Sequence, residues 1–212
     1  MADVPQRLAR CPVVVAPMAG GPSTAGLVIA ASAAGALGFL AAGYKTAAAM
    51  RAEMDAVEAG SAAPYGVNVF VPGAPTDPAA LEDYLAQLEP DAAALGVAPG
   101  RPEWSDDDWD AKLAVLLAHP PAVASFTFGC PEAGVIAALR AAGSAVWVTV
   151  TTPDEAALAA SRGADGLCVQ GPGAGGLADA ANVPRWAPAR RPCRTGPPPR
   201  PRPARWSHPD GS

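Results

Sequence analysis

The chain has 212 residues, of which 50% are hydrophobic and 17% are charged, and its formal net charge is -5. This balance provides apolar surface for a sizeable core and excludes a wholly disordered chain, which combines low hydrophobicity with high net charge. No uninterrupted apolar run reaches 18 residues, and residues 1–10 are mixed and polar. We therefore expect neither a membrane span nor a signal peptide, and we expect a cytoplasmic protein.

Charge is distributed unevenly along the chain. Residues 1–183 hold 8 Lys and Arg against 19 Asp and Glu, whereas residues 184–212 hold 7 Arg and one acidic residue, Asp210. The acidic body argues against nucleic acid as the main partner. The four cysteines are far apart in the chain: Cys11, Cys130, Cys168 and Cys193. Without a C-x-x-C or His/Cys cluster, they predict neither a zinc site nor a disulfide framework.

Six short apolar runs alternate with helical segments. The runs are residues 13–18, 36–43, 65–71, 122–129, 145–150 and 166–171. Their β-branched and aromatic residues predict strands that are buried on both faces, as in a parallel sheet. This β/α repeat is typical of a doubly wound sheet or of a (β/α) barrel. No G-x-G-x-x-G turn follows the first run, which weakens the case for a Rossmann fold.

Two of the intervening segments predict helices with clear patterns. Residues 46–59 place Met50, Met54 and Val57 on one helical face. Thr152-Pro153-Asp154-Glu155 is a capping box with proline at the first helical position. Gly143 and Gly163 stand where helices are expected to end.

Two further helix starts rest on acidic residues. Asp77-Pro78 predicts a helix that runs toward Leu88. Ser105–Asp108 predicts another, in which the three aspartates are a solvated helix start. This helix would carry one apolar stripe: Trp109, Leu113, Leu116 and Leu117.

The composition changes at residue 182, where proline and arginine become dominant. Such a stretch cannot bury a core, so we predict a folded domain over residues 1–181 and a disordered tail over residues 182–212. The upstream chain is rich in Ala and Gly, which implies GC-rich codons. Read out of frame, these give mostly Pro, Arg, Ala and Gly, so a frameshifted end is our preferred interpretation. The alternative is a selected basic tail that binds an acidic partner or an SH3-like groove.

Polar residues in or after the predicted strands are the candidates for binding. The glycine-rich turn at residues 16–24 either is structural or lets a phosphate-bearing cofactor approach, with Ser23 or Thr24 capping the next helix. Asn68 interrupts an apolar run, so its amide either ties down a neighbouring loop or contacts a ligand. Gln170 repeats the pattern in the last run. Because the active face of a (β/α) barrel lies at the carboxyl ends of its strands, these amides suggest hydrogen bonding to a heterocycle.

The usual catalytic groups are sparse. His119 lies in a helix-to-strand connection, which is expected at the end of the barrel opposite the one that carries these amides. Cys130 follows a predicted strand and could line a pocket. Lys45 either touches a cofactor or is exposed. No Ser/His/Asp set and no paired carboxylates emerge.

Six stretches in this order resemble the nitronate monooxygenase family, formerly called 2-nitropropane dioxygenases. They are APMAGGPST (16–24), LGFLAAGY (37–44), GVNVFVP (66–72), SFTFGCP (125–131), VWVTVT (146–151) and VQG (169–171). The resemblance implies an FMN-dependent TIM-barrel enzyme that oxidises alkyl nitronates with O₂. By the family pattern, Asn68, Gln170 and Gly175 would contact FMN, and Met18 would lie near the isoalloxazine ring. The family's catalytic histidine follows an Ala-Gly-Gly turn, whereas here Ala174-Gly175-Gly176 is followed by Leu177.

The fold class implied is α/β, an incomplete TIM (β/α)8 barrel of about six β/α units. Since the catalytic histidine is absent and two units are missing, we expect the chain to be inactive by itself. The expected partners are an alkyl nitronate and O₂, with no nucleic acid and no membrane.

Two alternatives to this function stay open. One is another FMN-dependent barrel oxidoreductase, either enoyl-reductase-like or IMP-dehydrogenase-like, the latter needing a catalytic cysteine loop that is not recognisable. The other is a non-enzymatic binder that acts through the basic tail.

Overall fold

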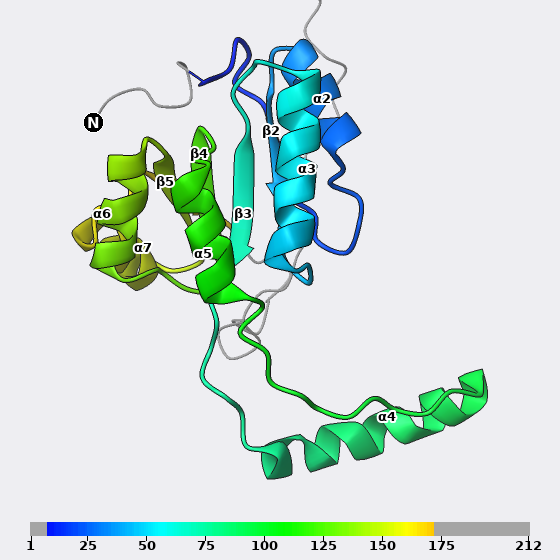
Figure 1. The fold of residues 1–212 in the computed structure, drawn as a ribbon. Coiled ribbons are helices and arrows are strands. Elements are labelled where there is room, and N and C mark those ends of the chain that lie inside the picture. The colour runs from blue at the N-terminus through cyan, green and yellow to red at the C-terminus, as the bar shows by residue number, and fades with distance from the viewer. Residues whose placement is uncertain (1–7, 172–212) are drawn as a thin grey trace, which may run out of the picture.

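Six parallel strands form one sheet that curls into a half-barrel (Figure 1). The computed structural model describes residues 8–171. The strands are β1 (Val14–Val15), β2 (Leu37–Ala41), β3 (Gly66–Phe70), β4 (Val123–Thr127), β5 (Ala145–Val150) and β6 (Gly166–Val169). They lie in sequence order, each paired in parallel with the next. The prediction of a partial (β/α) barrel is confirmed. β5 matches its apolar run, and the other five strands are shorter than theirs.

The helices connect successive strands. They are α2 (Ala25–Ala33), α3 (Ala47–Gly60), α4 (Glu82–Leu95), α5 (Trp109–Ala118), α6 (Ala133–Ala142) and α7 (Pro153–Ser161), with a 3-10 turn η1 (Pro78–Leu81) before α4. The capping box at Thr152 and Glu155 is present as predicted, with Pro153 at the first helical position. Gly143 ends α6 in the left-handed conformation that glycine favours. The start and stop signals in the sequence therefore fix where these helices begin and end.

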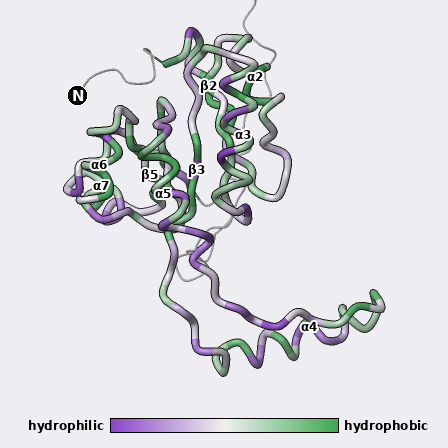
Figure 2. Tube along the Cα trace, in the orientation of Figure 1, coloured by the Kyte–Doolittle hydropathy of each residue, from purple (hydrophilic) through white to green (hydrophobic). Residues whose placement is uncertain are grey.

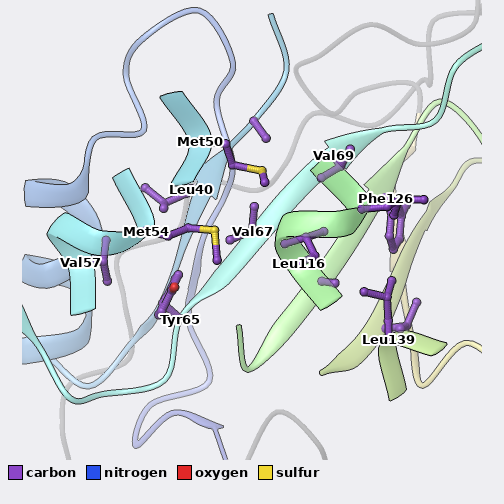
Figure 3. Packing of buried hydrophobic residues seen from close by; sticks show 14 of the residues in the cluster. Leu40, Met50, Met54, Val57, Tyr65, Val67, Val69, Leu116, Phe126 and Leu139 are labelled. Carbon is purple, nitrogen blue, oxygen red and sulfur yellow. The ribbon is translucent and has the colours of Figure 1, made fainter. Parts of the chain in front are cut away.

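The outer face of the sheet packs against helices (Figure 3). As predicted, Met50, Met54 and Val57 of α3 are at most 1% exposed. They join one apolar cluster with residues from β3, β4, α5 and α6, among them Val67, Val69, Phe126, Leu116 and Leu139. Because successive side chains of a strand point to opposite faces, Val67 and Val69 face the helices while Asn68 faces the inside of the half-barrel.

The inner face is packed by aromatic rings that lie over glycines of a neighbouring strand. A Cβ atom on Gly66 would be 2.2 Å from Cε1 of Phe39, which is 2% exposed. One on Gly166 would be 2.8 Å from Cδ1 of Trp147. The two rings also approach each other, with centroids 5.8 Å apart. These glycines are therefore needed for close packing, in the large-against-small pattern that fills small barrels.

Two predicted patterns are wrong in detail. On α5, Leu117 is 41% exposed whereas Lys112 is fully buried, because Lys112 forms an ion pair with Asp107 of the preceding turn. On β6, burial alternates instead of covering both faces, and Val169 is 79% exposed, because β6 is an edge strand of the described sheet.

The segment after β3 also differs from its prediction. The helix expected from Asp77-Pro78 toward Leu88 is η1 followed by α4, which continues through Pro90 to Leu95. It projects away from the sheet (Figure 1). Figure 2 shows that α4 alternates between hydrophilic and hydrophobic residues along its length. Within residues 8–171, no helix has the length and apolarity that crossing a bilayer requires.

We predict that Gly66→Ala lowers the free energy of unfolding by about 1–3 kcal/mol, because the new methyl group overlaps the buried ring of Phe39. The matched control is Gly134→Ala in α6, where a Cβ atom meets nothing within 4 Å and a helical alanine is favoured. Urea unfolding of both variants checks the expectation. Equal midpoints for the two variants would show that Phe39 does not fill the space above Gly66.

Candidate functional site

The carboxyl ends of the parallel strands share one edge of the sheet, and the turn after β1 lies there. The N–H of Met18 donates to Ser23 Oγ at 2.8 Å, which closes this turn. Ser23 is 1% exposed, and Thr24 caps α2 by accepting from Leu27 N at 3.2 Å. Of the two candidates for the cap, Thr24 is the one that takes the role. The Met18 side chain is left 41% exposed at this edge.

Asn68 lies in the middle of β3 and is 4% exposed. Its Nδ2 donates to Ser125 Oγ at 2.9 Å and to Thr127 Oγ1 at 3.0 Å, both on β4. Thr127 in turn lies 3.4 Å from Thr149 Oγ1 on β5. We call these four side chains the polar ladder. Asn68 was expected at the end of a strand, and that expectation is wrong, because it lies in the middle of β3. Of its two expected roles, tying down a loop is not seen, since the neighbouring strand supplies these partners.

The polar ladder leaves acceptor capacity on Asn68. Both of the hydrogen bonds at 3.0 Å or less are donated by its NH₂ group. Among the described residues, its Oδ1 accepts only a long contact, 3.5 Å from Thr127 Oγ1. A carbonyl oxygen has two lone pairs. The ladder therefore holds the carboxamide in one orientation, with an oxygen that can accept from an N–H or O–H group of a bound molecule.

Gln170 follows β6 at the same edge and is half-buried. Its backbone N–H donates to Val150 O at 2.9 Å, which continues the pairing of β6 with β5. The structure thus places Met18 and Gln170 at the carboxyl edge of the sheet, with Asn68 two residues before the end of β3. Gly175 and Leu177 lie outside the described residues, as does the predicted boundary at residue 181.

Three aromatic residues line this edge and were missed by the sequence analysis. The ring centroids of Tyr44 and Phe70 are 5.4 Å apart, and those of Phe70 and Phe128 are 4.7 Å apart. Tyr44 follows β2 and is 71% exposed, while Phe128 follows β4 and is 48% exposed. We call these three residues the aromatic rim. The sequence held a signal for these aromatic residues, because Tyr44 and Phe128 each stand beside a glycine at the end of a predicted strand: Gly43 precedes Tyr44, and Gly129 follows Phe128.

A buried ion pair supports the rim from behind. Lys112 Nζ lies 2.7 Å from Asp107 Oδ2, although the angles are not those of a hydrogen bond. The other oxygen, Asp107 Oδ1, accepts from the backbone N–H of Tyr44 at 2.9 Å. The next residue, Asp108, accepts from Ala47 N at the start of α3. The aspartates predicted to be a solvated helix start therefore hold the turn that carries Tyr44.

The remaining candidates have structural partners. Lys45 Nζ lies 2.7 Å from both carboxylate oxygens of Glu53. Cys130 is half-buried, and its thiol donates to Pro131 O at 3.5 Å. His119 caps the end of α5 on the amino side of β4, the side on which it was expected.

A cavity of about 390 Å³ lies away from these residues. It is lined by the chain around β1, by Leu37 at the start of β2, by Trp147, and by Asp165–Cys168 at the start of β6. Burial raises the pKa of the Cys168 thiol. None of Met18, Asn68 and Gln170 lines this cavity, so the largely apolar space between the two edge strands is separate from the candidate site.

Comparisons with known proteins show the family that the chain matches. The family model for nitronate monooxygenase matches residues 6–185. The chain is 39% identical to a nitronate monooxygenase of Pseudomonas aeruginosa over 171 residues, which cover 78% of this chain and 48% of that protein. It is 37% identical to one of Paraburkholderia phytofirmans, with 78% and 46% covered. The chain thus spans about half the length of the curated relatives it matches.

Two solved structures are similar to this chain in fold. Nitroalkane oxidase from Streptomyces ansochromogenes is 45% identical and superposes with a TM-score of 0.71, over 79% of this chain and 48% of that one. FabK from Thermotoga maritima is 21% identical with a TM-score of 0.57, over 79% of this chain and 42% of that one. At this identity the likeness to FabK extends to the fold alone.

We predict that Asp107→Asn lowers the free energy of unfolding by about 3 kcal/mol, because it leaves the buried Lys112 ammonium group without a counter-charge. Adding Lys112→Met should recover most of this loss. The matched control is Asp108→Asn, which changes a neighbouring aspartate that is not paired with Lys112 and should cost well under half as much. Denaturant unfolding of the four proteins checks this, and equal losses for the two aspartates would contradict it.

Proposed function

Because the chain belongs to the nitronate monooxygenase family, we propose that the carboxyl edge of its sheet is built for FMN-dependent oxidation of alkyl nitronates by O₂. The observation that carries the proposal is the carboxamide of Asn68, which is buried and oriented by the hydroxyls of Ser125 and Thr127. A buried amide held in this way is suited to reading the edge of a polar heterocycle.

The residues at this edge fit a flavin. Asn68 Oδ1 can accept from the ring N–H of the isoalloxazine, and Gln170, which follows β6, would add a contact. By the family pattern, Gly175 would add another. The exposed Met18 would pack beside the ring. The turn that carries Met18 contains Gly20 and Gly21, around which a Cβ atom would meet nothing within 4 Å. When bound, FMN supplies the redox chemistry by taking electrons from the nitronate and passing them to O₂.

We further propose that this chain does not complete the reaction by itself. The family assigns the role of base to a histidine after the Ala-Gly-Gly turn, and Leu177 stands at that position. A leucine side chain has no atom that can accept a proton, whereas general-base catalysis contributes typically 10²–10⁴-fold in rate. The described residues would therefore bind and orient flavin and substrate without supplying the base.

We predict that titration of the purified 212-residue chain with FMN gives saturable but weak binding, and that Asn68→Ala weakens it at least fivefold. The matched control is Ser144→Ala, which removes another buried hydrogen-bonding group, 2.7 Å from Pro121 O at the amino edge. Each variant should lose about 1–3 kcal/mol of stability, because each leaves buried partners unpaired. Flavin fluorescence measures the affinity. Absence of saturable binding, or equal weakening by the two variants, would count against the flavin site.

The second prediction concerns Leu177. We expect no turnover of propionate 3-nitronate by the FMN-supplemented chain, and a rate at least tenfold higher for Leu177→His, because the substitution restores a base at neutral pH. Leu177→Gln, which is polar but not basic, is the control. Oxygen consumption measures the rate. Turnover by the unaltered chain would overturn the proposal that it is inactive.

A further inference from the structure

The aromatic rim is continuous with the polar ladder. Phe70 and Asn68 are two residues apart on β3, so their side chains point to the same face, with Phe70 nearer the carboxyl edge. The rings of Tyr44 and Phe128 meet that of Phe70 at interplanar angles of 77° and 63°. A half-exposed apolar surface therefore begins where the buried amide of the candidate site ends.

The backbone at both outer rings is in an unfavourable conformation. Tyr44 has φ 63° and Phe128 has φ 68°, in the left-handed region that bulky side chains rarely adopt. The Tyr44 turn is held there by the hydrogen bond from its N–H to Asp107, whose other oxygen pairs with buried Lys112. A strained backbone that keeps apolar side chains exposed is typical of binding sites, because a fold without such a role would favour burying those side chains.

The charges near the rim do not favour an anionic group on it. Lys45 follows Tyr44 in the sequence, and Lys112 is linked to the Tyr44 turn through Asp107. Each of these lysines is paired with a carboxylate at 2.7 Å. The carboxylate of Asp107 itself lies directly behind the Tyr44 turn. A neutral apolar group of a ligand would contact the faces and edges of the rings here. A negatively charged group would gain little from Lys45 or Lys112, because each is already paired with a carboxylate.

We propose that the aromatic rim binds the hydrocarbon chain of the nitronate, so that the site favours nitronates with long alkyl chains over short ones. This inference rests on the proposed function and adds the substrate class. The nitronate group would lie toward the polar ladder, and the chain would extend across Phe70 toward the rings of Tyr44 and Phe128. Tyr44 and Phe128 are then residues that determine specificity.

The test compares the anions of 1-nitrohexane and nitroethane as ligands of the full chain, by saturation-transfer NMR at alkaline pH. The hexyl nitronate should bind about tenfold more tightly, since a rim that covers one side of the chain removes roughly half the surface of its four extra methylenes from water. Saturation of aromatic protein protons should also transfer to the methylenes of the ligand. This second readout needs no variant.

Tyr44→Gly and Phe128→Gly should each reduce the ratio of the hexyl to the ethyl affinity at least threefold. Glycine relieves the left-handed backbone at these positions, so both variants are expected to fold. The control is Tyr84→Ala, which removes an exposed ring from α4. Equal affinities for the two anions, no binding of the hexyl nitronate, or an unchanged preference in both variants would overturn the inference.

The outcome is separable from that of the proposed function. Loss of the FMN titration together with an intact chain-length preference would reject the flavin site and keep the rim. Saturable FMN binding that depends on Asn68, together with equal binding of the two nitronates, would reject the rim alone.

Discussion

The ring of Phe70 occupies the space in which Gly43 would otherwise carry a side chain. A Cβ atom on Gly43 would be 2.2 Å from Phe70 Cε2, closer than any real contact. From this position the ring touches Tyr44, which follows Gly43, and Phe128, which follows β4. One side chain of β3 thus contacts the turns at the ends of both neighbouring strands. Because Phe70 also shares a strand face with Asn68, the same packing places the exposed rings beside the buried amide.

The rest of the inner face is organised in the same way. Phe39 takes the space above Gly66, and Trp147 takes the space beside Gly166. Each aromatic residue of one strand requires a glycine on the next, so the sheet can curve inward without empty space between its rings. The polar ladder lies among these aromatic residues. The curvature of the half-barrel and the position of the candidate site therefore have a common cause in the alternation of aromatic, glycine and small polar residues on one face.

Local signals were enough to predict most elements of this fold. The apolar runs located all six strands, and the spacing of Met50, Met54 and Val57 predicted the buried face of α3, because both depend on neighbours within one element. The partners of Asn68 could not be predicted in this way. Ser125 and Thr127 are 57 and 59 residues away, and they meet the amide only through the register of β3 with β4.

Lys112 shows the same limit for helices. The predicted apolar stripe of α5 did not include Lys112, and its burial depends on a carboxylate placed by the left-handed backbone of Asp107. Burying two opposite charges generally costs as much as their attraction returns, so the pair is weak evidence for stability. The geometry of the pair explains its presence better than stability does. Asp107 divides its two oxygens between the Lys112 ammonium group and the backbone of Tyr44. An unpaired carboxylate would turn toward water, whereas one fixed by a buried cation keeps the Tyr44 turn in a conformation that a tyrosine would not otherwise adopt.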